Sequence, residues 1–209
     1  MENVMEILLI RHGKTKGNLE RRYVGRTDEP LLESEEERLK EQAERLRQSR
    51  PHPGRICTSP MLRCRQTAAI LFDGEAESVT DLRETDFGCF EYHCYEELKD
   101  DPSYQAWIDS GGLADYPEGE PGEQFRRRTR DAFRNCVQKA DEDGIDCLAI
   151  VCHGGVIMSI LSGICGEDTF YNWQAANGDG FFLQLDLKKE KNQLQWVSTF
   201  CVQSLTKLQ

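Results

Sequence analysis

The sequence predicts an α/β fold over residues 1–209, a single domain of three layers with a mostly parallel sheet between two layers of helices. Short apolar runs alternate with longer segments of helical composition, which is the pattern of parallel strands joined by helices. A chain of 209 residues is long enough to bury a substantial core. Its 38% hydrophobic and 30% charged residues are ordinary for a folded protein, which argues against extensive disorder.

In the first third of the chain, strands and helices alternate with clear boundaries. Glu6–Ile10 is an apolar run that ends at Arg-His-Gly, as a buried strand does where it meets a loop. Ser34–Ser49 has apolar residues at helical spacing, and Arg55–Thr58 is a short strand. Pro60–Phe72 is then a helix with proline near its start.

The same alternation continues in the last third. A helix is expected over Gln124–Ala140, and a strongly apolar strand over Asp146–Cys152. The next helix spans Val156–Ile164. Two strands, Gly180–Leu187 and Gln195–Val202, complete the predicted sheet.

The middle of the chain, about residues 82–123, breaks the alternation. It is rich in aromatic and acidic residues, glycine and proline. We interpret it as an inserted lobe over the carboxyl ends of the strands, where open α/β sheets bind ligands. A surface loop without function is the alternative, and composition does not decide between them.

Charge and composition limit the partners. The chain has 26 Lys and Arg against 37 Asp and Glu, a net charge of −11, which argues against nucleic acid and an anionic membrane surface as partners. The apolar runs are too short to span a bilayer, and no signal-peptide pattern follows Met1. The nine cysteines are scattered without a Cys-x-x-Cys pair, so we expect reduced thiols, a cytoplasmic protein and no metal site. A small anionic substrate requires a local site that reverses the sign of the charge.

Two histidines follow predicted strands in the same way. Arg11-His12-Gly13 follows the first strand, and His153-Gly154-Gly155 follows the strand that ends at Cys152. If these strands are neighbours, both histidines face one pocket. The glycines let the backbone approach a ligand closely, and the helix after Gly155 would direct free amides toward an anion. Either histidine motif alone is a weak signal.

Five segments together carry a resemblance to a known family. In chain order they are residues 10–18 (IRHGKTKGN), 25–31 (GRTDEPL), 58–68 (TSPMLRCRQTA), 82–88 (LRETDFG) and 152–157 (CHGGVI). They resemble the signature blocks of the histidine phosphatase superfamily, which includes the cofactor-dependent phosphoglycerate mutases. Residues 86–88 and 95–98 look most like the α-ribazole phosphatase branch and its broad-specificity relatives.

The resemblance implies a metal-independent phosphomonoesterase that needs no cofactor and acts on a small phosphate ester through a phosphohistidine. Phosphoryl transfer spreads negative charge over oxygens, so positioning and positive charge do most of the catalysis. The implied roles are His12 as nucleophile, Arg11, Arg63 and His153 as donors to the phosphoryl group, Glu84 as general acid and then base, and Asn18, Gly25 and Gly154 as substrate-binding residues.

The resemblance also has departures. Tyr92 stands after Glu91 where the family often has glycine, and Val24 stands before Gly25 where many mutases have a hydroxyl residue. The glycine usual soon after Leu31 is missing. Resembling mutases protect the phosphoenzyme with a longer chain and a C-terminal tail, so we expect hydrolysis here. A cofactor-dependent mutase is the first alternative, and a binding module without catalysis is the second.

Two features stay open at this point. The aromatic residues around the lobe could line a pocket for a flat, nucleoside-like alcohol such as that of α-ribazole 5′-phosphate, or they could form the lobe's small core; they are Phe87, Phe90, Tyr92, Tyr95, Trp107 and Tyr116. The basic run Arg126–Arg128 is interpreted as a solvated helix face paired with acids.

Overall fold

A computed structural model describes residues 4–187 and 202–208. They form one six-stranded sheet with the order β3-β2-β4-β1-β5-β6. The strands are β1 (Val4–Arg11), β2 (Arg55–Thr58), β3 (Glu77–Ser78), β4 (Cys147–Cys152), β5 (Gly180–Asp186) and β6 (Val202–Leu208).

The sheet is mixed, and its first four strands in this order are parallel. β4 pairs with β1 on one side and with β2 on the other, while β5 runs antiparallel to both β1 and β6. All six residues of β4 are buried, as expected of a central strand covered on both faces. The predicted α/β fold with a mostly parallel sheet is therefore confirmed.

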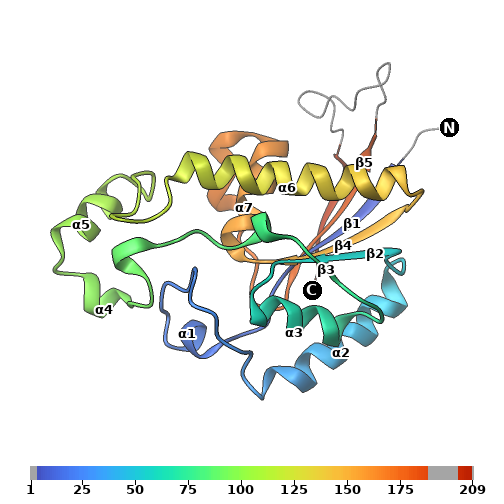
Figure 1. Ribbon diagram of the computed structural model, residues 1–209, viewed down its shortest axis with the longest axis horizontal. Coiled ribbons are helices and arrows are strands. Elements are labelled where there is room, and N and C mark those ends of the chain that lie inside the picture. Colours follow the sequence, from blue (N-terminus) through green and yellow to red (C-terminus); the bar gives the residue numbers. More distant parts are fainter. Residues whose placement is uncertain (1–3, 188–201, 209) are drawn as a thin grey trace.

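Helices cover the two faces of the sheet (Figure 1). On one face lie α6 (Gly122–Glu142) and α7 (Gly154–Cys165), and on the other α2 (Glu35–Ser49) and α3 (Leu62–Leu71). Alternate residues of β1 enter the two cores: Ile7 and Leu9 pack with side chains of α6 and α7, and Leu8 and Ile10 with those of α2 and α3. The three predicted layers follow from this alternation.

The segment 82–123 carries the short helices α4 (Tyr95–Leu98) and α5 (Pro102–Asp109), and α1 (Lys16–Leu19) lies nearby. Figure 1 shows this segment at the left of the molecule, and β1 runs toward that side from the chain's N-terminus at the right. The segment holds a small core of its own, in which buried Phe90, Leu98 and Tyr104 are surrounded by four partly buried aromatic rings, Tyr23, Phe87, Trp107 and Tyr116. Three short 3₁₀ helices, Thr80–Leu82, Gly88–Phe90 and Glu167–Trp173, complete the described elements.

Most predicted elements match the structure within a few residues. The helix predicted from Val156 already begins at Gly154, so the amides after His153 belong to its first turn. The short, exposed strand β3 was not predicted. The strand expected over Gln195–Val202 lies outside the described residues except for Val202, where β6 begins.

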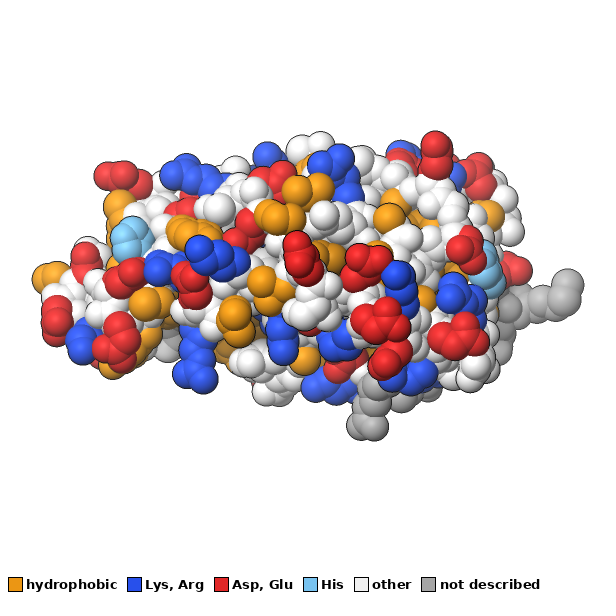
Figure 2. Space-filling model, turned by 90° about the horizontal axis from the view of Figure 1, so that it is seen from below, with side chains coloured by type: hydrophobic (Ala, Val, Ile, Leu, Met, Phe, Trp, Pro, Cys, Tyr) orange, Lys and Arg blue, Asp and Glu red, His pale blue; other side chains and the backbone are white. Residues whose placement is uncertain are grey.

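The described surface mixes both signs of charge. Figure 2 shows Lys and Arg side chains dispersed among Asp and Glu on the face seen from below. None of the helices within residues 4–187 and 202–208 has the length and apolar character needed to cross a membrane.

Candidate active site

The pairing of β1 with β4 brings the two motif histidines together. Arg11 lies opposite Cys152 in the parallel register, so His12 and His153 follow at adjacent strand ends. The backbone N–H of His12 donates to the carbonyl of Cys152 at 3.0 Å. Their ring centroids are 5.2 Å apart, with planes inclined by 67°, and both side chains are buried. The predicted convergence of these histidines is therefore present.

The hydrogen bond at His12 fixes which ring nitrogen is free. Its Nδ1 lies 2.7 Å from the carbonyl oxygen of Gly13, and because a carbonyl only accepts, Nδ1 carries the proton. Burial, together with the charges of Arg63 and Arg11, lowers the pKa of His12 well below its usual value. The ring is therefore neutral, with an unprotonated Nε2.

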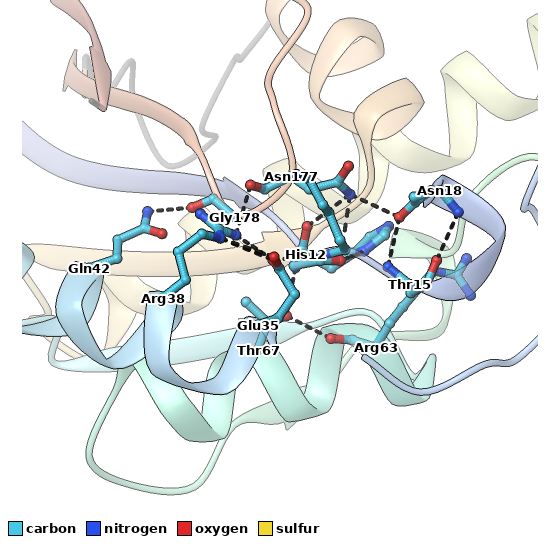
Figure 3. Close-up of polar contacts among 12 residues, drawn as sticks. His12, Thr15, Asn18, Glu35, Arg38, Gln42, Arg63, Thr67, Asn177 and Gly178 are labelled. Atoms are coloured by element: carbon cyan, nitrogen blue, oxygen red, sulfur yellow. Dashed lines mark hydrogen bonds and ion pairs between the residues drawn. The ribbon is translucent and has the colours of Figure 1, made fainter. Parts of the chain in front are cut away.

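Several contacts hold the loop behind His12 in place (Figure 3). The N–H of Gly13 donates to the hydroxyl of Thr67 at 3.0 Å, and that hydroxyl donates to the carbonyl of Arg63 at 2.7 Å. The buried carboxylate of Glu35 accepts the N–H of Lys14 at 2.8 Å. The nucleophile candidate therefore sits on a backbone fixed by both α2 and α3.

His153 is held by a residue that sequence reasoning did not find. Its Nε2 lies 2.8 Å from the hydroxyl of Ser59, and the thiol of Cys64 lies 3.5 Å from the same nitrogen. Burial is the main cause of a strongly lowered pKa of His153. Ser59 directly follows β2, the neighbour of β4, so its position at a third adjacent strand end was the available signal.

Arg63 is fully buried and binds backbone as well as facing the histidines. Its Nη1 donates to the carbonyl of Thr27 at 2.7 Å and its Nη2 to that of Gly25 at 2.8 Å. Its buried Nε has no hydrogen-bond partner among the residues that the structure describes. Part of the guanidinium thus fixes a loop, and the remaining donors are available to an anion.

Arg11, like Arg63, binds a backbone carbonyl and has a buried Nε that is left over. Its Nη1 donates to the carbonyl of Ala175 at 2.8 Å, and its buried Nε has no partner within the described part of the chain. A Cβ on Gly154 would lie 3.4 Å from that Nε, an ordinary contact distance, so the guanidinium packs against the start of α7 without requiring glycine there. Two orphaned N–H groups on two arginines are the donor set expected of an anion site.

Gly25, which we expected to bind substrate, makes its contacts within the protein. The N–H of Gly25 donates to Glu91 at 3.0 Å, and a Cβ there would lie 2.1 Å from the carbonyl oxygen of Thr85. The structure therefore engages Gly25 within the protein, as an anchor of the loop that Arg63 holds. Because its N–H already donates to Glu91, it is not free to bind a substrate, which was the role expected of Gly25.

Glu84 lies against the start of α7. Its carboxylate accepts the N–H of Gly155 at 2.9 Å and that of Thr85 at 3.0 Å. A Cβ on Gly155 would lie 2.4 Å from the Glu84 Oε1, so this approach requires glycine. Burial raises the pKa of Glu84, although both N–H donors and the two site arginines oppose the shift. We expected the helix after Gly155 to direct free amides toward an anion; the helix begins at Gly154, and the Gly155 N–H in its first turn binds this carboxylate.

The backbone of Glu84 is fixed by one member of the basic run on α6. Arg128 donates to the carbonyls of Asp81, Arg83 and Glu84 at 2.8–3.0 Å, and it forms an ion pair with Glu120 at 2.6 Å. The prediction of a solvated helix face paired with acids is met only in part, since Arg128 pairs with an acid but is 16% exposed, and neither Arg126 nor Arg127 has an acidic partner among the described residues. Arg128 also has a positioning role that the sequence did not reveal.

Asn18 and Asn177 form a pair beside His12 (Figure 3). The Nδ2 of Asn177 donates to the Asn18 Oδ1 at 2.9 Å and to the carbonyl of His12 at 3.3 Å. Because the Asn18 oxygen also accepts the N–H of Thr15 at 3.3 Å, its amide nitrogen is left to donate elsewhere. Sequence reasoning missed Asn177, whose Asn-Gly dipeptide resembles any turn.

A cavity of about 860 Å³ adjoins this group at Glu84 and Gly155. Its wall includes seven aromatic side chains, Tyr23, Phe87, Trp107, Tyr116, Phe125, Phe170 and Tyr171. Of the six aromatic residues singled out in the sequence, Phe87, Trp107 and Tyr116 line the cavity and also belong to the small core of the lobe. Phe90 belongs to that core alone, and Tyr92 and Tyr95 belong to neither. Within residues 4–187 and 202–208, no group of three or more His, Cys, Asp or Glu side chains could hold a metal ion.

Comparisons with known proteins agree with this arrangement. Residues 7–199 match the family model described as the histidine phosphatase superfamily (branch 1). The chain is 29% identical over 166 residues to the broad-specificity phosphatase YOR283W of Saccharomyces cerevisiae, covering 76% of this chain and 70% of the relative. It is 33% identical over 171 residues to the "Probable phosphoglycerate mutase GpmB" of Yersinia enterocolitica, covering 78% and 76%.

Two further similarities concern α-ribazole phosphatases. The adenosylcobalamin/alpha-ribazole phosphatase of Salmonella typhimurium is 27% identical over 194 residues, covering 88% of this chain and 91% of the relative. The crystal structure of the alpha-ribazole phosphatase from Shigella flexneri superposes with a TM-score of 0.75 over 95% of both chains at 21% identity, which shows a shared fold.

Proposed function

The chain belongs to the histidine phosphatase superfamily, branch 1, and from that premise we propose that it is a metal-independent phosphomonoesterase of the histidine acid phosphatase type. It hydrolyses a small phosphate ester through a phosphohistidine. The observation that carries the proposal is the His12 ring, whose proton is held on Nδ1 by Gly13 and whose Nε2 is free, under the charges of buried Arg63 and partly buried Arg11.

In the first step, the lone pair of the His12 Nε2 forms a bond to phosphorus while the bond from phosphorus to the alcohol oxygen breaks. Glu84, whose pKa is raised by burial, acts as the general acid and gives its proton to the leaving oxygen. In the second step, a water molecule attacks the phosphohistidine and gives a proton to the Glu84 carboxylate. Inorganic phosphate leaves, and His12 and Glu84 return to their starting states.

The other residues stabilise charge on the transferring group. The Nε–H groups of Arg11 and Arg63 lack partners among the described residues and donate to phosphoryl oxygens. His153 and the Asn18 amide add further donors. Gly154, the first residue of α7, packs beside the Arg11 guanidinium and is proposed to contact the substrate.

For the substrate, we infer a small alcohol with a flat ring, of which α-ribazole 5′-phosphate is an example. The relatives named as α-ribazole phosphatases and the aromatic wall of the 860 Å³ cavity support this choice. A cofactor-dependent phosphoglycerate mutase is the alternative favoured by the relative named GpmB. A binding module without catalysis is the second alternative.

One experiment separates the three. Wild type, His12→Ala and the exposed-histidine control His52→Ala are incubated with p-nitrophenyl phosphate and EDTA, and released phosphate is measured. We expect release by wild type and His52→Ala, and a loss of at least about 10³-fold in His12→Ala. Equal release by His12→Ala would remove His12 as nucleophile.

The remaining outcomes identify the alternatives. Isomerisation of 3-phosphoglycerate with a bisphosphate primer, without net hydrolysis, would indicate the mutase. Binding of phosphoesters without turnover would indicate the module.

A further inference from the structure

The charged side chains that line the 860 Å³ cavity are incompletely paired. Arg130 forms an ion pair with Glu167, with an Nη2–Oε2 distance of 2.8 Å, and Arg134 pairs with Asp131 at 2.6 Å. Arg126, on the same helix α6, forms no hydrogen bond or ion pair through its side chain with any residue that the structure describes. The residue is partly buried and lines the cavity.

The acids near Arg126 do not compensate its charge. Both carboxylate oxygens of Glu167 are held by Arg130, and the pKa of Glu167 is lowered mainly by those bonds and more weakly by the Arg126 charge. Glu123, one turn earlier on α6, is exposed and lies beyond ion-pair distance of Arg126 in the described structure. Arg127, the next residue of α6, also lines the cavity without an ion pair to any described residue, but it is exposed. Arg126 is therefore the partly buried, unpaired cation of a wall in which charged and aromatic side chains are mixed.

The position of this cation relates it to the reaction. Glu84 and Gly155 line the same cavity, and Glu84 is the residue proposed to protonate the leaving alcohol. An alcohol leaving from His12 past Glu84 thus enters a space with aromatic walls and Arg126 among its lining residues. In a chain with a net charge of −11, acidic side chains are in excess, so a partly buried arginine that lines a cavity without an acidic partner indicates a place for an anion.

We propose that the leaving alcohol of the natural substrate carries a second anionic group, a carboxylate or phosphate, beside an aromatic ring, and that Arg126 binds that group. This inference rests on the proposed phosphatase function. Arg126 acts as a specificity residue: it touches the substrate far from the reacting atoms, so it lowers KM and leaves kcat nearly unchanged. The alcohol of α-ribazole 5′-phosphate lacks such a group and would leave Arg126 unused.

The test uses two substrates that differ by one charge, 4-(phosphonooxy)phenylacetate and its N-methylamide. We expect wild type to prefer the acid by about tenfold in kcat/KM, equivalent to about 1.4 kcal/mol. Arg126→Ala should bring the ratio to about one through KM, and Arg126→Lys should restore part of it. Lys139→Ala, which removes a positive charge from the far part of α6 outside the cavity lining, should keep the wild-type ratio.

The outcomes are distinct. If wild type hydrolyses both compounds equally well, or if Arg126→Ala keeps the preference, this inference is wrong and the phosphatase function stands. An equal loss of preference in Lys139→Ala would assign the effect to general charge and would also overturn the role of Arg126. Hydrolysis of neither compound overturns the proposed function and this inference with it. Thermal unfolding of each variant shows that the comparison concerns folded protein.

Discussion

Replacing Glu84 by Gln tests whether this carboxyl group protonates the leaving alcohol. Gln keeps the shape of Glu but has no acidic proton to give. General acid catalysis contributes about 10²–10⁴-fold, and it matters most when the leaving oxygen is strongly basic. We therefore expect kcat/KM for phenyl phosphate to fall by about 10³-fold, and for p-nitrophenyl phosphate, whose phenolate leaves without protonation, by about tenfold or less.

The fold should survive this substitution. The Glu84 carboxylate accepts N–H groups from Gly155 at 2.9 Å and from Thr85 at 3.0 Å, and Gln offers only one carbonyl oxygen for these two donors. One lost hydrogen bond at a partly buried group costs about 1–3 kcal/mol, which for a chain of this size lowers Tm by roughly 2–12 °C. Thermal unfolding of the variant checks this value.

The pH dependence gives a second readout. Because burial raises the pKa of Glu84, the protonated form persists to higher pH than for an exposed carboxyl group and is lost as pH rises through the raised value. The ratio of kcat/KM for phenyl phosphate to that for p-nitrophenyl phosphate should fall along this alkaline limb in wild type. It should be flat in Glu84→Gln.

Using kcat/KM isolates the first chemical step, because hydrolysis of the phosphohistidine comes after it. Equal losses of kcat/KM for the two substrates would refute the general-acid role of Glu84. The exposed control Glu37→Gln should leave both values unchanged.

Four further results are expected. Arg63→Met should lower stability by about 3 kcal/mol, or Tm by roughly 6–12 °C, because it leaves two buried carbonyls unpaired; an unchanged melting curve would contradict this. Tyr92 has a φ of 61°, so Tyr92→Gly should be about 1 kcal/mol more stable in urea unfolding than Tyr92→Ala, against the usual order. Asn177→Ala should reduce kcat/KM about three- to tenfold through its lost bond to the His12 carbonyl, with Tm nearly constant. The pKa values of His12 and His153 are lowered in the folded protein, so below pH ~6.5 these two histidines take up protons in the unfolded chain before they do so in the folded one. The free energy of unfolding should therefore fall by about 2 kcal/mol between pH 7 and 5.5. A constant free energy of unfolding would argue against neutral histidines.

The sequence predicted the parts of the fold and site that depend on local pattern. The apolar runs ending at Arg11 and Cys152 define β1 and β4, and their parallel pairing is sufficient to bring His12 and His153 to 5.2 Å. The departure at Tyr92 was also visible in the sequence. The structure adds its physical meaning, since the residue occupies the left-handed region that favours glycine.

The contacts that the sequence did not reveal are of another kind. Arg63 binds the carbonyls of Thr27 and Gly25, and Arg128 binds those of residues 81, 83 and 84. Every residue has a backbone carbonyl, so no sequence pattern marks the ones that a distant arginine will reach. Asn177 contacts His12 across 165 positions for the same reason. Its side chain is a common turn residue, and only the pairing of β5 with β1 places it.

In the proposed reaction, the two site arginines let an acidic chain bind and process an anion. Their charges, added to burial, lower the pKa of His12 and so keep its Nε2 free to attack. The same charges work against the raised pKa of Glu84, because they favour its carboxylate. A phosphoryl dianion between the arginines offsets that effect, so substrate binding itself raises the pKa of Glu84 further and secures the proton for the leaving oxygen. After phosphate departs, the arginine charges again favour the neutral ring of His12. In the proposed reaction, one pair of cations thus serves both binding and nucleophile activation.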